Sequence, residues 1–133
     1  MEIVPGVYQL RIRLKRPRTV RVGALGRHVF PAGWYVYTGS AHNGLAQRVA
    51  RHLRHNKRKY WHIDYLLAVA DHVEAFVLPG GKLTECELHA RLRGSRVLIP
   101  GFGASDCRCE AHLAYRDRRP RIGLTPWRES ARQ

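Results

Sequence analysis

Two short tyrosine motifs, Gly6-Val7-Tyr8 and Tyr37-Thr38-Gly39, are followed in the chain by Arg48 and His52. Two phenols and an imidazole can accept and pass on the proton of a water molecule, and a guanidinium can hold a phosphate group. Hydrolysis of a nucleic-acid backbone requires side chains of these types. A carboxylate for a metal ion is missing from this set, and Glu85 is the candidate for it.

Each of these groups has a defined task in phosphodiester hydrolysis. Arg48 can bind two phosphate oxygens through its planar fork, as lysine cannot, and can neutralise the charge that develops on them. A free tyrosine has a pKa of ~10 and is a poor base at neutral pH unless a neighbour draws its proton. His52 is placed to be that neighbour, and either Tyr8 or Tyr37 is expected to be the base. Glu85 would hold Mg²⁺ or Mn²⁺ together with waters and phosphate oxygens.

Strand-like patterns surround both tyrosine motifs. Apolar residues alternate with polar or basic ones over residues 4–14, and residues 34–38 are aromatic and β-branched, which predicts two strands. Between them, residues 19–22 and 27–30 flank a glycine-containing reversal, which predicts a hairpin. We therefore expect an α+β fold with a small, mainly antiparallel central sheet of three to four strands, elaborated by the extra hairpin and flanked by helices.

The predicted helices carry the other site residues. From Leu45 onward, apolar residues recur at spacings of three and four, which predicts a helix with Arg48 and His52 at the edge of its apolar face. Those two side chains can then lean over the sheet. A second helix is expected over residues 61–70 and a short strand over residues 73–78.

The second helix contains a histidine and an acid that have two interpretations. His62 and Asp64 are two residues apart, so they would share one side of a strand but lie on different sides of a helix. A joint metal site therefore depends on local geometry. Structural roles are the favoured interpretation, with support of the active site as the alternative.

A third helix is expected after Thr84, whose hydroxyl can bond the backbone amide of Glu87 in a capping box. Glu87 is therefore interpreted as a cap. Glu85 projects instead from the face that packs inward, where a carboxylate needs a partner. The alternative interpretation of Glu85 is an acid that complements the dipole in the first turn of the helix.

The charge of the chain points to a polyanionic partner. Its 133 residues include 24 lysines and arginines against 10 acids, for a net charge of +14, so we expect binding to nucleic acid, with DNA favoured over RNA. Residues 1–116 are expected to form one domain and residues 117–133 a basic, partly disordered tail. Tyr60 or Trp61 can stack on an unpaired base. Phosphates are expected to be held without sequence reading by a group of basic residues: Arg51, Arg54, Lys57, Arg58 and Lys59.

The sequence also indicates the compartment of the protein and the chemical state of its cysteines. No apolar run approaches the ~20 residues that span a bilayer, and the first residues lack the apolar stretch of a signal peptide, so we expect a cytoplasmic protein with no membrane partner. Three cysteines, an odd number, argue against a disulfide framework and for reduced thiols or metal ligands. The candidate set for tetrahedral zinc is Cys86, Cys107, Cys109 and His112, and the alternative is buried reduced cysteines.

Taken together, the motifs resemble the GIY-YIG endonuclease superfamily. They are similar above all to a little-characterised branch whose members occur alone or fused to endonuclease III-type glycosylases, and the resemblance covers about residues 5–115. The segments that carry it, besides the two tyrosine motifs, are Gly33–Ala41, Arg48–His52, Trp61–Leu66, Glu85–Glu87 and Gly101–Cys107.

The resemblance implies a small central antiparallel sheet and a single divalent-metal site that cuts one DNA strand. Tyr8, Tyr37, Arg48 and His52 match the motif positions, and Glu85 is carried over as the metal-binding glutamate. Two features depart from the family pattern: about thirty residues and an extra hairpin separate the tyrosine motifs, and Ser40 stands where some members carry a lysine.

Three functions fit these observations. The first is a metal-dependent endonuclease that hydrolyses phosphodiester bonds in DNA, directed by structure or damage in DNA repair. The second is a non-catalytic nucleic-acid-binding module with a nuclease-like fold. The third is a zinc-stabilised interaction domain that serves a repair glycosylase, which predicts bound zinc, little affinity for free DNA and no steep dependence on salt.

Overall fold

The structure, a computed structural model, describes residues 4–42, 44–54, 57–80, 84–92, 94–103 and 111–128, and for Glu85 it describes the backbone alone. The strands are β1 (Gly6–Leu14), β2 (Arg18–Arg21), β3 (Arg27–Phe30), β4 (Gly33–Ala41), β5 (His72–Pro79), β6 (Leu113–Arg116) and β7 (Thr125–Pro126). The helices are α1 (Leu45–Leu53), α2 (His62–Leu67) and α3 (Glu85–Ala90), with a short 3-10 turn at Gly23–Leu25. None of these helices is long and apolar enough to cross a membrane.

Five strands form the main sheet in the order β6-β4-β1-β5-β7, and every neighbouring pair is antiparallel. The hairpin of β2 and β3 forms a separate two-stranded sheet. The predicted α+β fold with its extra hairpin is therefore confirmed. The sheet has more strands than expected because two short segments, β6 and β7, extend its edges.

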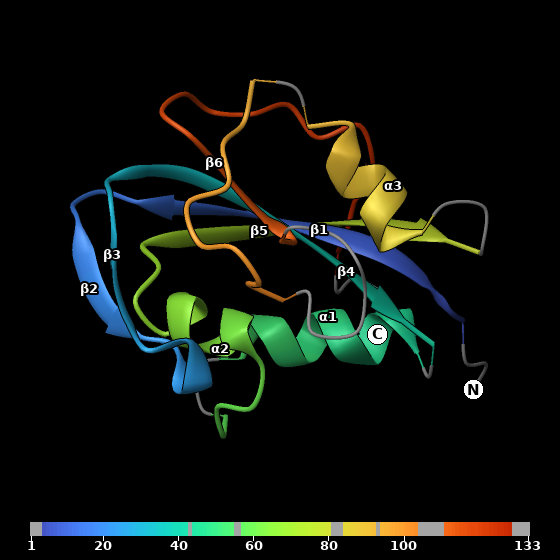
Figure 1. Cartoon of the computed structure of the whole chain (residues 1–133). Coiled ribbons are helices and arrows are strands. Elements are labelled where there is room, and N and C mark those ends of the chain that lie inside the picture. The colour runs from blue at the N-terminus through green and yellow to red at the C-terminus, as the bar shows by residue number, and fades with distance from the viewer. Residues whose placement is uncertain are drawn as a thin grey trace.

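Helices cover both faces of the sheet, with α1 and α2 on one face and α3 on the other (Figure 1). Tyr8 and the leucine and isoleucine that follow at period two point toward α1 and α2, where they join the buried core with Val49 and Ile63. On the opposite face Gln9 and Arg11 are buried as well. The tyrosine, arginine and histidine side chains that carry the predicted chemistry thus lie on the α1 face, whereas Glu85 begins α3 on the opposite face.

The segment after β6 was predicted to be a partly disordered basic tail, but its described part lies against the sheet. Nη1 of Arg11 donates to the carbonyl of Pro120 at 3.0 Å, and the amide of Trp127 donates to the carbonyl of Ala75 at 2.9 Å. β7 pairs with β5 through the same segment. These contacts join residues far apart in sequence and give no local signal, so the sequence did not predict them.

Candidate active site

The strand register brings the two tyrosine motifs together. β1 and β4 are neighbours in which Tyr8 pairs with Gly39 and Leu10 pairs with Tyr37, so the two tyrosine side chains share one face. Their ring centroids lie 6.3 Å apart. The long insertion between the motifs forms the β2–β3 hairpin and leaves the two tyrosine strands adjacent, so the insertion does not separate them.

The glycines of the motifs leave room for this pairing. A Cβ on Gly39 would lie 2.5 Å from Cζ of Tyr8, and a Cβ on Gly6 would lie 2.5 Å from the carbonyl oxygen of Leu78. Neither position can therefore take a side chain without a shift of its neighbours. Gly39 creates the space that the Tyr8 ring occupies.

His52 on α1 completes a buried phenol–imidazole cluster with these tyrosines. Its Nε2 is hydrogen-bonded to the hydroxyl of Tyr8 at 2.7 Å, and its ring centroid lies 6.2 Å from that of Tyr37. Burial lowers the pKa of His52 to about 3, so the imidazole is neutral at pH 7. Its Nδ1 is buried and has no hydrogen-bond partner among the described residues.

Arg48 lies one turn before His52 and reaches the same cluster through Trp61. Its Nη1 donates to the carbonyl of Ser40 at 3.1 Å, and its Cζ lies 4.4 Å from the centre of the Trp61 ring. The Trp61 ring in turn lies 5.8 Å from the ring of His52. A guanidinium has five N–H donors, so this anchored Arg48 keeps donors for a phosphate.

Asp64 holds the start of α2 and is the acid next to this cluster. Its carboxylate accepts from both terminal nitrogens of Arg51, at 2.9 and 3.0 Å, and from the amides of Tyr60 and Trp61, at 2.7 and 2.9 Å. Burial alone raises the pKa of Asp64, but these hydrogen bonds outweigh it and hold that pKa below its usual range. Asp64 therefore has the structural role that the sequence favoured.

His62 also has a structural role. Its Nδ1 accepts a hydrogen bond from the amide of Gly103 at 2.9 Å, which fixes the loop that carries Phe102 against the Tyr37 ring. Gly103 has a φ of +69°, and a Cβ there would lie 2.8 Å from the Tyr37 ring. The sequence marked this loop as a family motif but gave no sign that it supports Tyr37.

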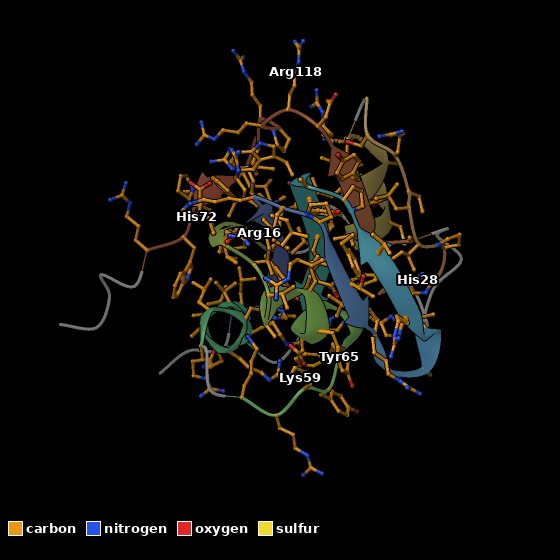
Figure 2. The ribbon with its side chains drawn as sticks, turned by 90° about the vertical axis from the view of Figure 1, so that its left-hand side faces the viewer. Arg16, His28, Lys59, Tyr65, His72 and Arg118 are labelled. Atoms are coloured by element: carbon orange, nitrogen blue, oxygen red, sulfur yellow. The ribbon has the colours of Figure 1, made fainter. Side chains whose placement is uncertain are left out.

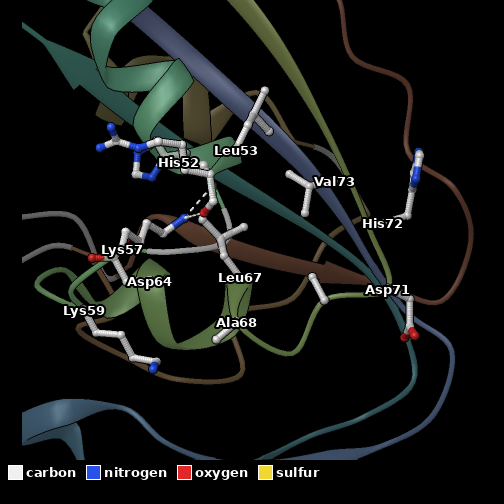
Figure 3. Close-up of a pocket in the computed structure, with 12 residues that line it drawn as sticks. His52, Leu53, Lys57, Lys59, Asp64, Leu67, Ala68, Asp71, His72 and Val73 are labelled. Carbon is white, nitrogen blue, oxygen red and sulfur yellow. Dashed lines mark hydrogen bonds between the residues drawn. The ribbon is translucent and has the colours of Figure 1, made fainter.

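Two of the five basic residues expected to hold phosphates are engaged within the fold. Arg51 binds Asp64, and Nζ of Lys57 donates to the carbonyls of His52 and Arg54 at 2.6 and 2.9 Å, which closes the end of α1 (Figure 3). The Arg51–Asp64 pair was not predictable because it follows from packing of α1 on α2. The remaining three of the set are exposed to solvent: Arg54, Arg58 and Lys59.

The predicted metal ligand, Glu85, is the first residue of α3, and its side chain lies outside what the structure describes. α3 packs against β4, on the face opposite α1. Glu87 accepts from the amide of Thr84 at 2.9 Å, so its predicted role as a cap is confirmed. Across the described ranges, no three His, Cys, Asp or Glu residues form a metal-binding group. The carboxylate of Asp64 already accepts hydrogen bonds from Arg51, Tyr60 and Trp61.

The candidate zinc residues give a different result from the reduced thiols that were expected. Cys86 is disulfide-bonded, and the predicted ligands Cys107 and Cys109 lie outside the described residues. The Cys86 sulfur lies 3.4 Å from Nε2 of His112, which is buried beneath α3. A sulfur in a disulfide is not a thiolate, so Cys86 in this form does not fit a zinc ligand.

A pocket of about 560 Å³ opens where α1 ends, beside α2 and the start of β5 (Figure 3). This volume is in the range of small-molecule sites. His52 and Asp64 line it, whereas Tyr8 and Tyr37 do not, so the pocket lies beside the phenol–imidazole cluster. Its lining also includes the charged residues Arg54, Lys57, Lys59 and Asp71.

Comparison with known proteins places most of this chain in one family. No curated protein matches the chain, and no solved structure matches it. The family described as domain of unknown function DUF123 matches residues 7–126, ten residues beyond the predicted domain end at residue 116. This match spans the main sheet, the three helices and all the tyrosine, arginine and histidine positions described above, and the chain belongs to the DUF123 family.

Proposed function

We propose that this protein is a metal-dependent endonuclease that hydrolyses phosphodiester bonds in DNA, directed by structure or damage in DNA repair. The observation that carries the proposal is the 2.7 Å hydrogen bond between the Tyr8 hydroxyl and Nε2 of His52, beside the anchored guanidinium of Arg48. The net charge of +14 supports a polyanionic substrate. We place this activity in the cytoplasm.

In the proposed reaction, a water oxygen bonds to phosphorus while the bond from phosphorus to the leaving oxygen breaks. The water proton passes to the Tyr8 oxygen as the phenolic proton moves to Nε2 of His52, and solvent protonates the leaving oxygen. Arg48 binds the non-bridging oxygens and stabilises the charge that develops on them. Tyr37, whose ring is 6.2 Å from that of His52, is the other candidate base.

The low pKa of His52 makes this residue a weak proton acceptor in the free protein. Substrate binding must therefore raise that pKa before His52 can take the proton of Tyr8. A phosphodiester brought to Arg48 adds a negative charge near the imidazole, and an opposite charge favours the protonated form. The pKa of His52 therefore rises when substrate binds. Proton transfer from Tyr8 is then coupled to occupation of the site.

Mg²⁺ or Mn²⁺ is the proposed cofactor. Glu85 is the proposed ligand from the chain, and its helix lies on the face of the sheet opposite to the helix of Arg48 and His52. A divalent ion at the phosphate would act as a Lewis acid toward the phosphoryl oxygen. No proton transfer described above passes through this ion. The metal requirement is therefore tested separately from the Tyr8–His52 pair.

A non-catalytic nucleic-acid-binding module is the second candidate, and burial of the cluster favours it. Tyr8, Tyr37 and His52 are 1%, 7% and 2% exposed. A phosphodiester therefore reaches Tyr8 only if the side chains packed around these three residues move. The buried acid beside them, Asp64, is already fully hydrogen-bonded. A module of this kind binds DNA but releases no cleavage product.

The deciding experiment incubates purified protein with flapped, branched and damaged DNA, with and without Mg²⁺ or Mn²⁺. We expect metal-dependent nicks that Glu85→Gln abolishes, with DNA binding retained. Glu87→Gln is the matched control, because Glu87 is two residues away and caps α3. Binding without nicks under every condition contradicts the endonuclease and supports the binding module. Bound zinc with little affinity for DNA supports the interaction domain for a repair glycosylase instead.

A further inference from the structure

We propose that Tyr60 is a stacking platform for an unpaired base, so that the protein selects DNA with unpaired nucleotides next to the bond that it cuts. This inference rests on the proposed function and names its substrate class. Tyr60 is 78% exposed, the most of the large hydrophobic side chains exposed in the described ranges. A single exposed aromatic residue is common, so the inference depends on what holds and surrounds it.

Tyr60 is held by a buried anchor. Its backbone amide donates to Oδ2 of Asp64 at 2.7 Å, and the amide of Trp61 donates to the same oxygen at 2.9 Å. The Tyr60 ring meets the Trp61 ring edge to face, with centroids 5.4 Å apart and an interplanar angle of 74°. A side chain that is already positioned loses less conformational freedom on binding than a mobile one.

A continuous line of rings joins this platform to the candidate active site. The Trp61 ring lies 5.8 Å from the His52 ring, and His52 is hydrogen-bonded to Tyr8. The guanidiniums of Arg48 and Arg51 lie 4.4 and 4.3 Å from the centre of the Trp61 ring. A base on Tyr60 would therefore belong to a nucleotide near the phosphate that Arg48 holds.

The charge around Tyr60 matches a nucleic acid. Arg58 and Lys59 directly precede Tyr60 in the chain and are exposed. Figure 2 shows Lys59 in the lower part of the view, below α1 and α2. The acid nearest in sequence, Asp64, is fully buried and paired with Arg51. Aromatic residues among cations bind single strands with little sequence preference, because every base has a stacking face. An intact duplex keeps those faces stacked within itself.

The test measures binding to a single-stranded oligonucleotide that carries 2-aminopurine and to the corresponding duplex, in EDTA so that no cleavage occurs. We expect Tyr60→Ala to weaken single-strand binding by roughly tenfold and to reduce the fluorescence quenching that stacking causes. Tyr60→Phe should restore both, because it keeps the ring. Duplex binding should stay unchanged in both variants, and Lys59→Ala should weaken both forms of DNA alike and lower the salt dependence.

Unchanged single-strand binding in Tyr60→Ala, equal weakening for duplex, or no measurable binding to either DNA overturns the inference. Because no metal is present, the result does not depend on turnover. A protein that shows the expected preference but never nicks DNA retains the stacking site and loses the endonuclease assignment. If the Tyr60→Ala variant nicks DNA as fast as the unaltered protein and binds single strands as tightly, the endonuclease assignment stands and the stacking site is overturned.

Discussion

Two pairs of tyrosines lie along the same face of the main sheet, and they differ in what their hydroxyls contact. Tyr8 and Tyr37 form one pair, with ring centroids 6.3 Å apart, and Tyr35 and Tyr115 form the other, 5.1 Å apart. Tyr8 and Tyr35 are equally buried, each 1% exposed. Burial therefore does not distinguish the candidate site from the structural core.

The hydrogen-bond partner does distinguish them. The hydroxyl of Tyr35 donates to the carbonyl of Pro31 at 2.6 Å, and that of Tyr115 donates to the carbonyl of Ala32 at 2.7 Å. Burial, with Tyr115 adding to it, raises the pKa of Tyr35. A backbone carbonyl cannot accept the phenolic proton, whereas the neutral imidazole beside Tyr8 can. The comparison indicates that a tyrosine becomes a candidate base through a titratable partner.

Of the substitutions considered, removal of that titratable partner should have the largest effect on the rate of DNA nicking. We expect His52→Gln to lower the rate of DNA nicking by roughly 100- to 10,000-fold, because no acceptor remains for the Tyr8 proton. His28→Gln is the matched control, since Nε2 of His28 is hydrogen-bonded to a backbone carbonyl, that of Leu25. Single-turnover cleavage of a substrate that the unaltered protein nicks measures both. Equal rates in the two variants would remove His52 from the proposed proton path.

The buried neutral His52 should also appear in the pH dependence of stability. Unfolded histidine takes a proton below about pH 6.5, whereas His52 in the fold does so only near its pKa of about 3. The unfolded state thus binds more protons in this interval, and the free energy of unfolding falls as the pH is lowered through it. The loss due to His52 is on the order of 5 kcal/mol.

Urea unfolding at a series of pH values measures this effect. The burial of His62 and His112 lowers their pKa values too, so the unaltered protein should lose stability from several groups. The comparison with His52→Gln isolates one of them, and that variant should show a clearly shallower decline between about pH 6.5 and 3. Parallel declines in the two proteins would mean that His52 is not neutral in the fold.

Each tyrosine pair has a glycine packed against it, which gives a matched pair of substitutions. A Cβ on Gly39 would meet the Tyr8 ring, and a Cβ on Gly33, at a φ of +144°, would lie 2.7 Å from the Tyr115 ring. Both alanine variants should lose about 1–3 kcal/mol of unfolding free energy through overpacking. Only Gly39→Ala should also lower the nicking rate per folded molecule, because it displaces Tyr8. Urea titrations and nicking assays on the same samples separate the two effects.

The smallest expected effect concerns a structural tyrosine. Tyr115→Phe removes one hydrogen bond and leaves the carbonyl of Ala32 without this donor, so we expect a loss of about 1 kcal/mol of unfolding free energy. Thermal unfolding measures it. A loss of nicking activity in folded Tyr115→Phe would erase the distinction between the two pairs.

The sequence predicted the parts of the fold that have a local pattern. Period-two spacing located the strand of Tyr8, and an aromatic, β-branched run located that of Tyr37. The apolar face of α1 located Arg48 and His52. No local sequence pattern indicates the ion pair between Arg51 and Asp64, because this pair depends on how α1 and α2 pack against each other. The same reason explains the unexpected edge strands β6 and β7, which have only four and two residues and form through pairing with distant strands.

The most direct test of the Tyr8–His52 assignment compares single-turnover DNA cleavage by Tyr8→Phe and Tyr115→Phe, with each variant shown to be folded by circular dichroism. Both substitutions remove one phenolic oxygen from the same face of the sheet. We predict that Tyr8→Phe cuts roughly 100-fold or more slowly, whereas Tyr115→Phe cuts at the rate of the unaltered protein. Equal cleavage by the two variants would contradict the assignment of Tyr8 as the proton-transferring residue.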